Sequence, residues 1–137
     1  MILDYFGDLN WLAILVATIA WFVFSAAWYS LPPLSSAWQR AVKVDVTGGP
    51  PLVTILIPTF IAYFVTSIVI ALIAKAIGAT ELADGMALGI VLGVGFGVVS
   101  ALIGQIYERK GAFYWVINGV NAVIAYAIVA IIVTVWD

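Results

Sequence analysis

The sequence predicts an all-α integral membrane protein, a four-helix transmembrane bundle, and two observations carry that expectation. Hydrophobic residues make up 66% of the 137-residue chain and charged residues only 9%, whereas soluble domains are roughly 45–50% apolar and about 25% charged. Four apolar stretches also reach the roughly 20 residues that a helix needs to cross a bilayer. We therefore expect a single transmembrane domain over residues 1–137.

The four predicted spans cover residues 10–31, 52–78, 84–107 and 112–136. Their only charged residues are Lys75, near the end of the second span, and Asp84, at the start of the third. Transmembrane β-strands would instead show short alternating segments, and none is visible. A cleaved signal peptide begins with basic residues, but Asp4 and Asp8 precede the first span without any Lys or Arg. We expect this span to be retained.

The longest connection, residues 32–51, begins with two prolines that stop the first helix. Within it, residues 37–44 carry Trp38 between small and basic side chains, including Arg40 and Lys43. An aromatic residue with neighbouring cations suits a short helix lying in the headgroup region. The other two connections are short. Helices two and three, and helices three and four, are therefore expected to be antiparallel neighbours.

Basic residues predict the orientation, because short cytoplasmic loops carry an excess of Lys and Arg. The first and third loops hold four cations and the opposite side only Lys75. The four are Arg40, Lys43, Arg109 and Lys110. This pattern predicts a multi-pass membrane protein with both termini outside the cytoplasm. Trp28 and Trp38 then lie at the inner interface, where aromatic side chains act as anchors.

The third span contains a row of small residues, Gly85, Gly89, Gly93, Gly97 and Ala101, spaced by four. Residues four apart share one helix face, so the row predicts a groove almost free of side chains. Such grooves let two transmembrane helices approach closely. The pattern leaves open whether the second helix belongs to the same chain or to another subunit, and we prefer the same chain.

Pro58 predicts a kink in the second span, with Thr54 and Thr59 placed to satisfy the freed backbone groups.

Polar side chains concentrate in the half of the spans expected to lie toward the cytoplasm. If they converge, they form a polar vestibule open to that side; otherwise they are hydrogen bonds that hold the helices together. The candidate vestibule residues are Tyr29, Tyr63, Gln105, Asn118 and Asn121.

The chain has no Cys and no His, which excludes disulfides, thiolate chemistry and the usual zinc sites. A small proton-coupled antiporter would need a carboxylate deep in a span, and no predicted span contains one. The net charge of −2 does not suggest nucleic acid. We therefore expect no catalytic residue, no cofactor and no metal. The expected function is that of a non-enzymatic membrane bundle that acts through helix association, as a homo-oligomer or as an accessory subunit of a membrane complex. The alternative is a small channel or transporter that uses the vestibule.

Several short motifs also suggest a family. Asn10-Trp11-Leu12-Ala13 opens the first span, Trp28-Tyr29-Ser30 closes it, and Trp38 follows after a proline-containing turn; the fourth span contains Ile117-Asn118. This pattern resembles a bacterial family of small four-span membrane proteins catalogued as a domain of unknown function (family 1761). The turn at residues 31–36 departs from the family pattern. The resemblance implies a four-helix fold and a bacterial membrane, without an activity.

Overall fold

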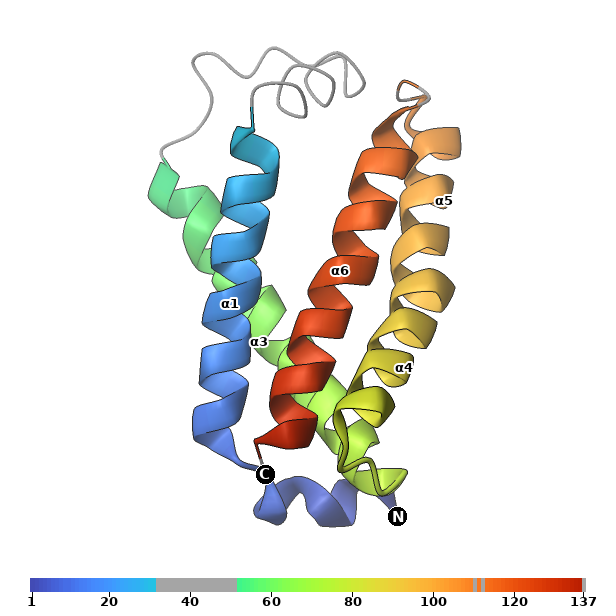
Figure 1. Cartoon of the computed structure of the whole chain (residues 1–137). Coiled ribbons are helices and arrows are strands. Elements are labelled where there is room, and N and C mark those ends of the chain that lie inside the picture. Colours follow the sequence, from blue (N-terminus) through green and yellow to red (C-terminus); the bar gives the residue numbers. More distant parts are fainter. Residues whose placement is uncertain (32–51, 110, 112, 137) are drawn as a thin grey trace.

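A computed structural model describes residues 1–31, 52–109, 111 and 113–136. Its order of elements is η1 (Ile2–Asp8), α1 (Trp11–Ser30), α3 (Leu52–Ala76), α4 (Leu82–Leu92), η2 (Gly93–Val98), α5 (Val99–Tyr107) and α6 (Phe113–Val135). Because α4, η2 and α5 form one continuous helix, the described residues contain four helices long and apolar enough to cross a membrane (Figure 1). The predicted all-helical, four-span fold is confirmed. The interfacial helix expected at residues 37–44, with Trp38, Arg40 and Lys43, lies outside the described residues.

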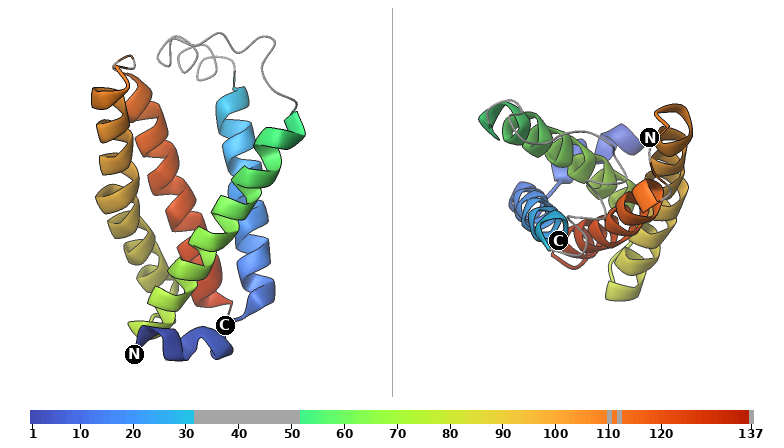
Figure 2. Two further views of the ribbon diagram at one scale, coloured as in Figure 1. Left: turned by 180° about the vertical axis from the view of Figure 1, so that it is seen from behind. Right: turned by 90° about the horizontal axis from the view of Figure 1, so that it is seen from above.

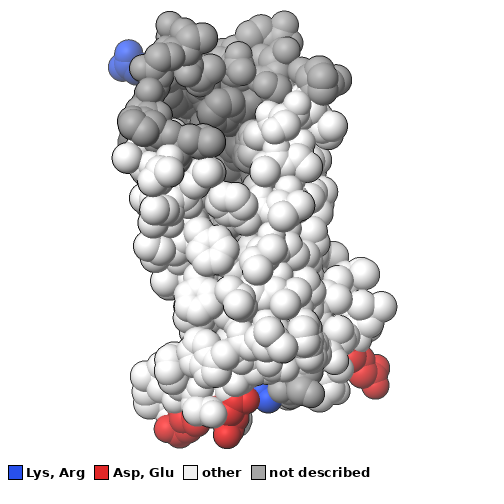
Figure 3. Space-filling model, turned by 90° about the vertical axis from the view of Figure 1, so that its left-hand side faces the viewer, with Lys and Arg blue, Asp and Glu red and all other residues white. Residues whose placement is uncertain are grey.

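Both chain termini lie at one end of the bundle, which we call the terminal end; the opposite end is the far end (Figure 1). Asp4 and Asp8 belong to η1, and Glu81 and Asp84 lie at the start of α4, so these acidic residues are at the terminal end. Figure 3 shows acidic side chains gathered there. The 3₁₀ helix η1 lies across this end and contacts α3. This helix was not predicted from the sequence.

Asn10 connects the first and last spans at the terminal end. Its side-chain oxygen accepts a hydrogen bond from the backbone N–H of Ala13 at 3.1 Å, which caps the start of α1. Its amide nitrogen donates to the backbone carbonyl of Trp136 at 3.0 Å, just beyond α6. One side chain thus satisfies backbone groups at two helix ends.

Helix α6 is the centre of the bundle, since it contacts α1, α3, α4, η2 and α5. Helix α3 crosses the others obliquely, and its far half leans away from them (Figure 2). All of its described buried residues lie between Ser67 and Ala74. The expected packing of the second span against the third was wrong, because α4 places its small residues against α6 and makes no extended contact with α3.

Helix α3 is assigned as continuous from Leu52 to Ala76, with Pro58 inside it. The Thr59 hydroxyl donates to the carbonyl of Ile55, at 2.7 Å. The Thr59 hydroxyl therefore does not donate to the Thr54 carbonyl, which lacks its usual helical donor because Pro58 has no N–H.

Candidate functional site

The glycine row of the third span lies against α6 of the same chain. A Cβ atom on Gly89 would lie 2.3 Å from the Cα atom of Ala127, so only glycine permits this approach. The other three glycines meet α6 similarly: Gly85 at the Ile131 backbone (2.9 Å), Gly93 at the Val123 backbone (2.6 Å) and Gly97 at the Ala122 side chain (2.4 Å). Ala101 continues the row and is half-buried. This face is occupied within the chain and is not a free surface.

The glycine row runs into a π-helical segment, η2, which the sequence did not reveal. A π turn contains one residue more than an α turn and changes which side chains face the partner helix. Contacts with α6 accordingly include Val98, whose Cγ2 atom would lie 3.3 Å from a Cβ on Gly119. They continue at Gly104, which lies beside the Tyr114 ring.

Two of the predicted vestibule residues, the asparagines of α6, form hydrogen bonds with α1. The Tyr29 hydroxyl donates to the side-chain oxygen of Asn118. The Asn121 amide nitrogen donates to the Ser25 hydroxyl oxygen at 3.3 Å, and both of these residues are buried. Both bonds join α1 to α6.

Tyr63, the vestibule candidate on α3, stacks on Trp21 of α1 with ring centroids 4.0 Å apart and an interplanar angle of 10°. Trp21 is 7% exposed and meets the Tyr126 ring of α6 edge-on at 5.4 Å. Sequence reasoning missed Trp21. Its position at the middle of a span was a signal, because tryptophan in membrane proteins is enriched at the interfaces instead.

The polar side chains therefore converge only in part. Tyr29 and Tyr63 line one groove, with Asn118 and Asn121 bonded to α1 beside it. Gln105, half-buried on α5, is not among the residues that line that groove. Trp28 is also half-buried, and its indole N–H finds no acceptor among the described residues.

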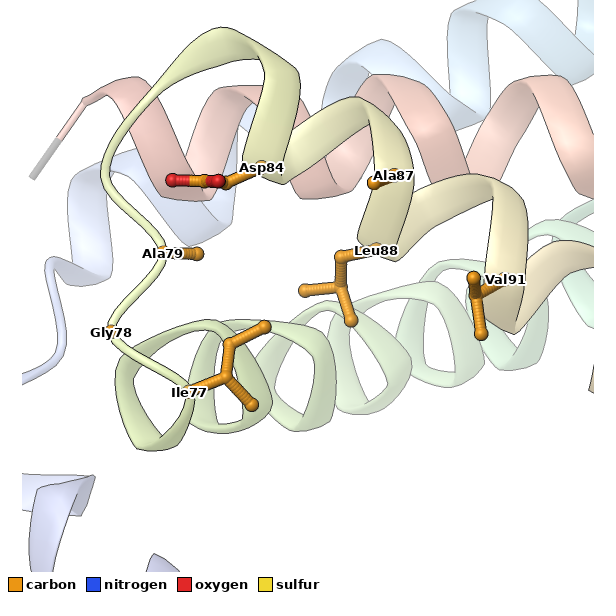
Figure 4. Close-up of a pocket in the computed structure, with 7 residues that line it drawn as sticks. All are labelled: Ile77, Gly78, Ala79, Asp84, Ala87, Leu88 and Val91. Carbon is orange, nitrogen blue, oxygen red and sulfur yellow. The ribbon is translucent and has the colours of Figure 1, made fainter.

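Two cavities lie between α3 and the continuous helix of α4 and η2. The cavity nearer the terminal end, of about 360 Å³, has Ile77 on one wall and Leu88 on the other, with Asp84 at its edge (Figure 4). The second, of about 340 Å³, lies between Ile73 of α3 and Phe96 of η2. We call these two cavities together the α3–α4 groove.

A second groove, of about 310 Å³, lies between the far halves of α1 and α3. We call it the α1–α3 groove. Its walls include Phe22 and Leu56, and Ser25, Tyr29 and Tyr63 add hydroxyl groups. No cluster of three or more potential metal ligands among His, Cys, Asp and Glu occurs within the described ranges.

The four apolar helices of the described residues, three of them packed around α6, indicate a small multi-pass membrane protein. The chain belongs to the family described as protein of unknown function (DUF1761), whose model matches residues 12–134. This agrees with the resemblance in the sequence motifs. No curated protein matches the chain, and no solved structure does.

Proposed function

We propose that this protein is a non-enzymatic membrane bundle that acts by associating with another transmembrane helix, and that the helix lies in the α3–α4 groove. The observation that carries the proposal is that α3 and α4 make no extended contact and leave two cavities between them. The glycine row does not support the proposal, because α6 fills it.

The dimensions of the groove favour a helix as its occupant. Its wall on α4 and η2 runs from Asp84 to Phe96, and that on α3 from Val65 to Ile77. At ~1.5 Å of rise per residue, each wall is about 18 Å long, more than half of a bilayer core about 30 Å thick. Helices associate in membranes by such close packing, with no water to drive them together.

The groove favours a second copy of this chain as the source of that helix. Phe96 lies on one wall and is 64% exposed, so a large side chain protrudes beside an unfilled cavity. In a two-fold dimer, each Phe96 can enter the cavity of the other copy, because an isologous interface pairs the same patch with itself.

The proposal is tested by placing a bulky side chain on the α4 wall of the groove. Ala87 is exposed and lines the cavity nearer the terminal end, so Ala87→Phe should block the incoming helix without disturbing the α4–α6 contact. Subunits are counted by single-molecule photobleaching in lipid nanodiscs. We expect wild-type dimers, and a dimer fraction at least tenfold lower for Ala87→Phe. The matched control is Ala27→Phe, at an exposed position of α1 that lines neither groove.

A monomeric wild-type protein at every protein-to-lipid ratio would refute self-association. In that case, a photo-crosslinking residue at position 87 decides whether the groove holds a helix of a different membrane protein. Crosslinks to lipid alone would refute association through this groove altogether.

We also propose the orientation that the cations predict, in a bacterial inner membrane, with the terminal end outside and the far end in the cytoplasm. The acidic cluster at the terminal end supports it (Figure 3), although acidic residues contribute little to such orientation.

A further inference from the structure

The α1–α3 groove is separate from the α3–α4 groove, because the two share no lining residue. Helices α1 and α3 contact each other, and the far half of α3 leans away from the bundle (Figure 2). The groove lies between the far halves of the two helices. Phe22, Ile55 and Leu56 form much of its apolar surface. Its volume of about 310 Å³ is at the lower end of the range for small-molecule sites, roughly 300–1,000 Å³.

The Tyr63 hydroxyl is the unusual group in this groove, because it has no hydrogen-bond partner among the described residues. Tyr63 lies eleven residues beyond Leu52, about 16 Å along the helix at ~1.5 Å per residue. A polar group that deep in hydrocarbon is costly without a partner. An occupant that accepts a hydrogen bond from Tyr63 removes this cost.

The other hydroxyl groups of the groove are already engaged, with one exception. Thr59 donates to the Ile55 carbonyl and Ser30 to the Ala26 carbonyl, each within its own helix. Ser25 accepts from Asn121, so its own proton is free for a second hydrogen bond. The groove therefore keeps two free donors, the hydroxyl groups of Tyr63 and Ser25.

No Lys, Arg, Asp or Glu occurs among the described residues that line the groove. A charged group placed there would be unpaired in a low-dielectric environment. The buried part of the occupant is therefore neutral, apolar along most of its length, and equipped with an oxygen acceptor. We propose that the α1–α3 groove binds one uncharged lipid through a carbonyl oxygen that accepts a hydrogen bond from Tyr63, with its hydrocarbon against Phe22 and Leu56.

Carbonyl groups on hydrocarbon tails have two common sources in membranes, acyl esters and prenyl quinones, and two probes separate them. Dioleoylglycerol and decylubiquinone are titrated into the purified protein in detergent, and bound molecules are counted by native mass spectrometry. We expect saturable binding of one molecule per chain. The probe that binds identifies the source; charged lipids such as palmitate should not compete.

The decisive variant is Tyr63→Phe, which keeps the stack on Trp21 and removes only the hydroxyl. Losing one hydrogen bond should weaken binding about three- to tenfold. Tyr107→Phe, at a side chain that is 82% exposed, is the matched control and should bind as the wild type does. Binding unchanged by Tyr63→Phe, or no saturable binding of either probe, would overturn the proposal.

A second pair of variants makes the test independent of Tyr63. Ala26 lines the groove, whereas its exposed neighbour Ala27 does not. Ala26→Phe should fill the groove and abolish binding, while Ala27→Phe leaves it intact. Equal binding by these two variants would place the lipid elsewhere and refute the site.

Discussion

Gly89 and Ala127 bring the backbones of α4 and α6 into direct contact, since a Cβ atom at position 89 would lie 2.3 Å from the Ala127 Cα atom. No flexible side chain is present at that point to move aside. The two helices would therefore have to separate to admit even a methyl group. This contact makes α6 the centre of the fold and determines which faces of α4 remain free.

We expect Gly89→Ala to destabilise the bundle by about 1–3 kcal/mol, the usual cost of overpacking. Gly95→Ala is the matched control on the same continuous helix, because nothing lies within 4 Å of that Cβ position. Alanine also has a higher helix propensity than glycine, so Gly95→Ala should be neutral or slightly stabilising. Thermal unfolding in detergent, followed by circular dichroism, measures both. Equal melting temperatures would mean that α4 and α6 are not in contact at Gly89.

The hydrogen bond from Tyr29 to Asn118 predicts an energetic coupling between α1 and α6. In a double-mutant cycle of Tyr29→Phe and Asn118→Ala, we expect a coupling free energy of about 0.6 kcal/mol and no more than about 1.7 kcal/mol, as for other interhelical hydrogen bonds in membranes. The free energy of unfolding is measured in mixed micelles for the wild type, the two single variants and the double variant.

The control cycle pairs Asn118→Ala with Tyr107→Phe, whose side chain is 82% exposed. It should give no coupling within error. A coupling in the control as large as that with Tyr29 would show that the effect does not come from the hydrogen bond.

The four spans were predictable because the length of an apolar run is a local property of the sequence. The glycine row was predictable for the same reason, since a spacing of four marks one helix face. The sequence could not show that α6 rather than α3 fills that face, because apolar sequence alone does not identify the helix that packs there. The splay of α3 accompanies that choice and was not predicted.

The candidate polar site was predictable only in outline. Tyr29, Tyr63, Asn118 and Asn121 stood out because polar side chains are rare in spans, but their partners depend on how the helices are rotated about their axes. Gln105 has the same character and lies outside the groove lined by Tyr63. Trp21 was missed because an apolar ring in an apolar span gives no contrast in hydropathy.

The Asn121 amide distinguishes a structural role from a transport role. It is buried, and its hydrogen bond to Ser25 is long, at 3.3 Å. Leucine has nearly the same shape and removes a polar group that is poorly satisfied. Asn121→Leu should therefore leave the melting temperature unchanged or raise it slightly.

The channel alternative makes a different prediction for the same variant. If Asn121 lines a wetted path, reconstituted vesicles should pass small ions or solutes, and Asn121→Leu should reduce that flux while the protein stays folded. We expect wild-type vesicles to be no leakier than empty ones across a panel of small ions and uncharged solutes. A flux that Asn121→Leu abolishes without loss of folding would favour the channel over a structural role.

The orientation can be tested with single cysteines, because the natural chain has none. Thr80, in the connection between α3 and α4, marks the terminal end, and Glu108, just after α5, marks the far end; both are exposed. The cations predict that the far end is cytoplasmic. In intact cells, a membrane-impermeant maleimide should therefore label Thr80→Cys and not Glu108→Cys. Permeabilised cells are the control, in which both cysteines should react equally. Labelling of Glu108→Cys alone would reverse the orientation, and equal labelling in intact cells would indicate that the chain inserts in both directions.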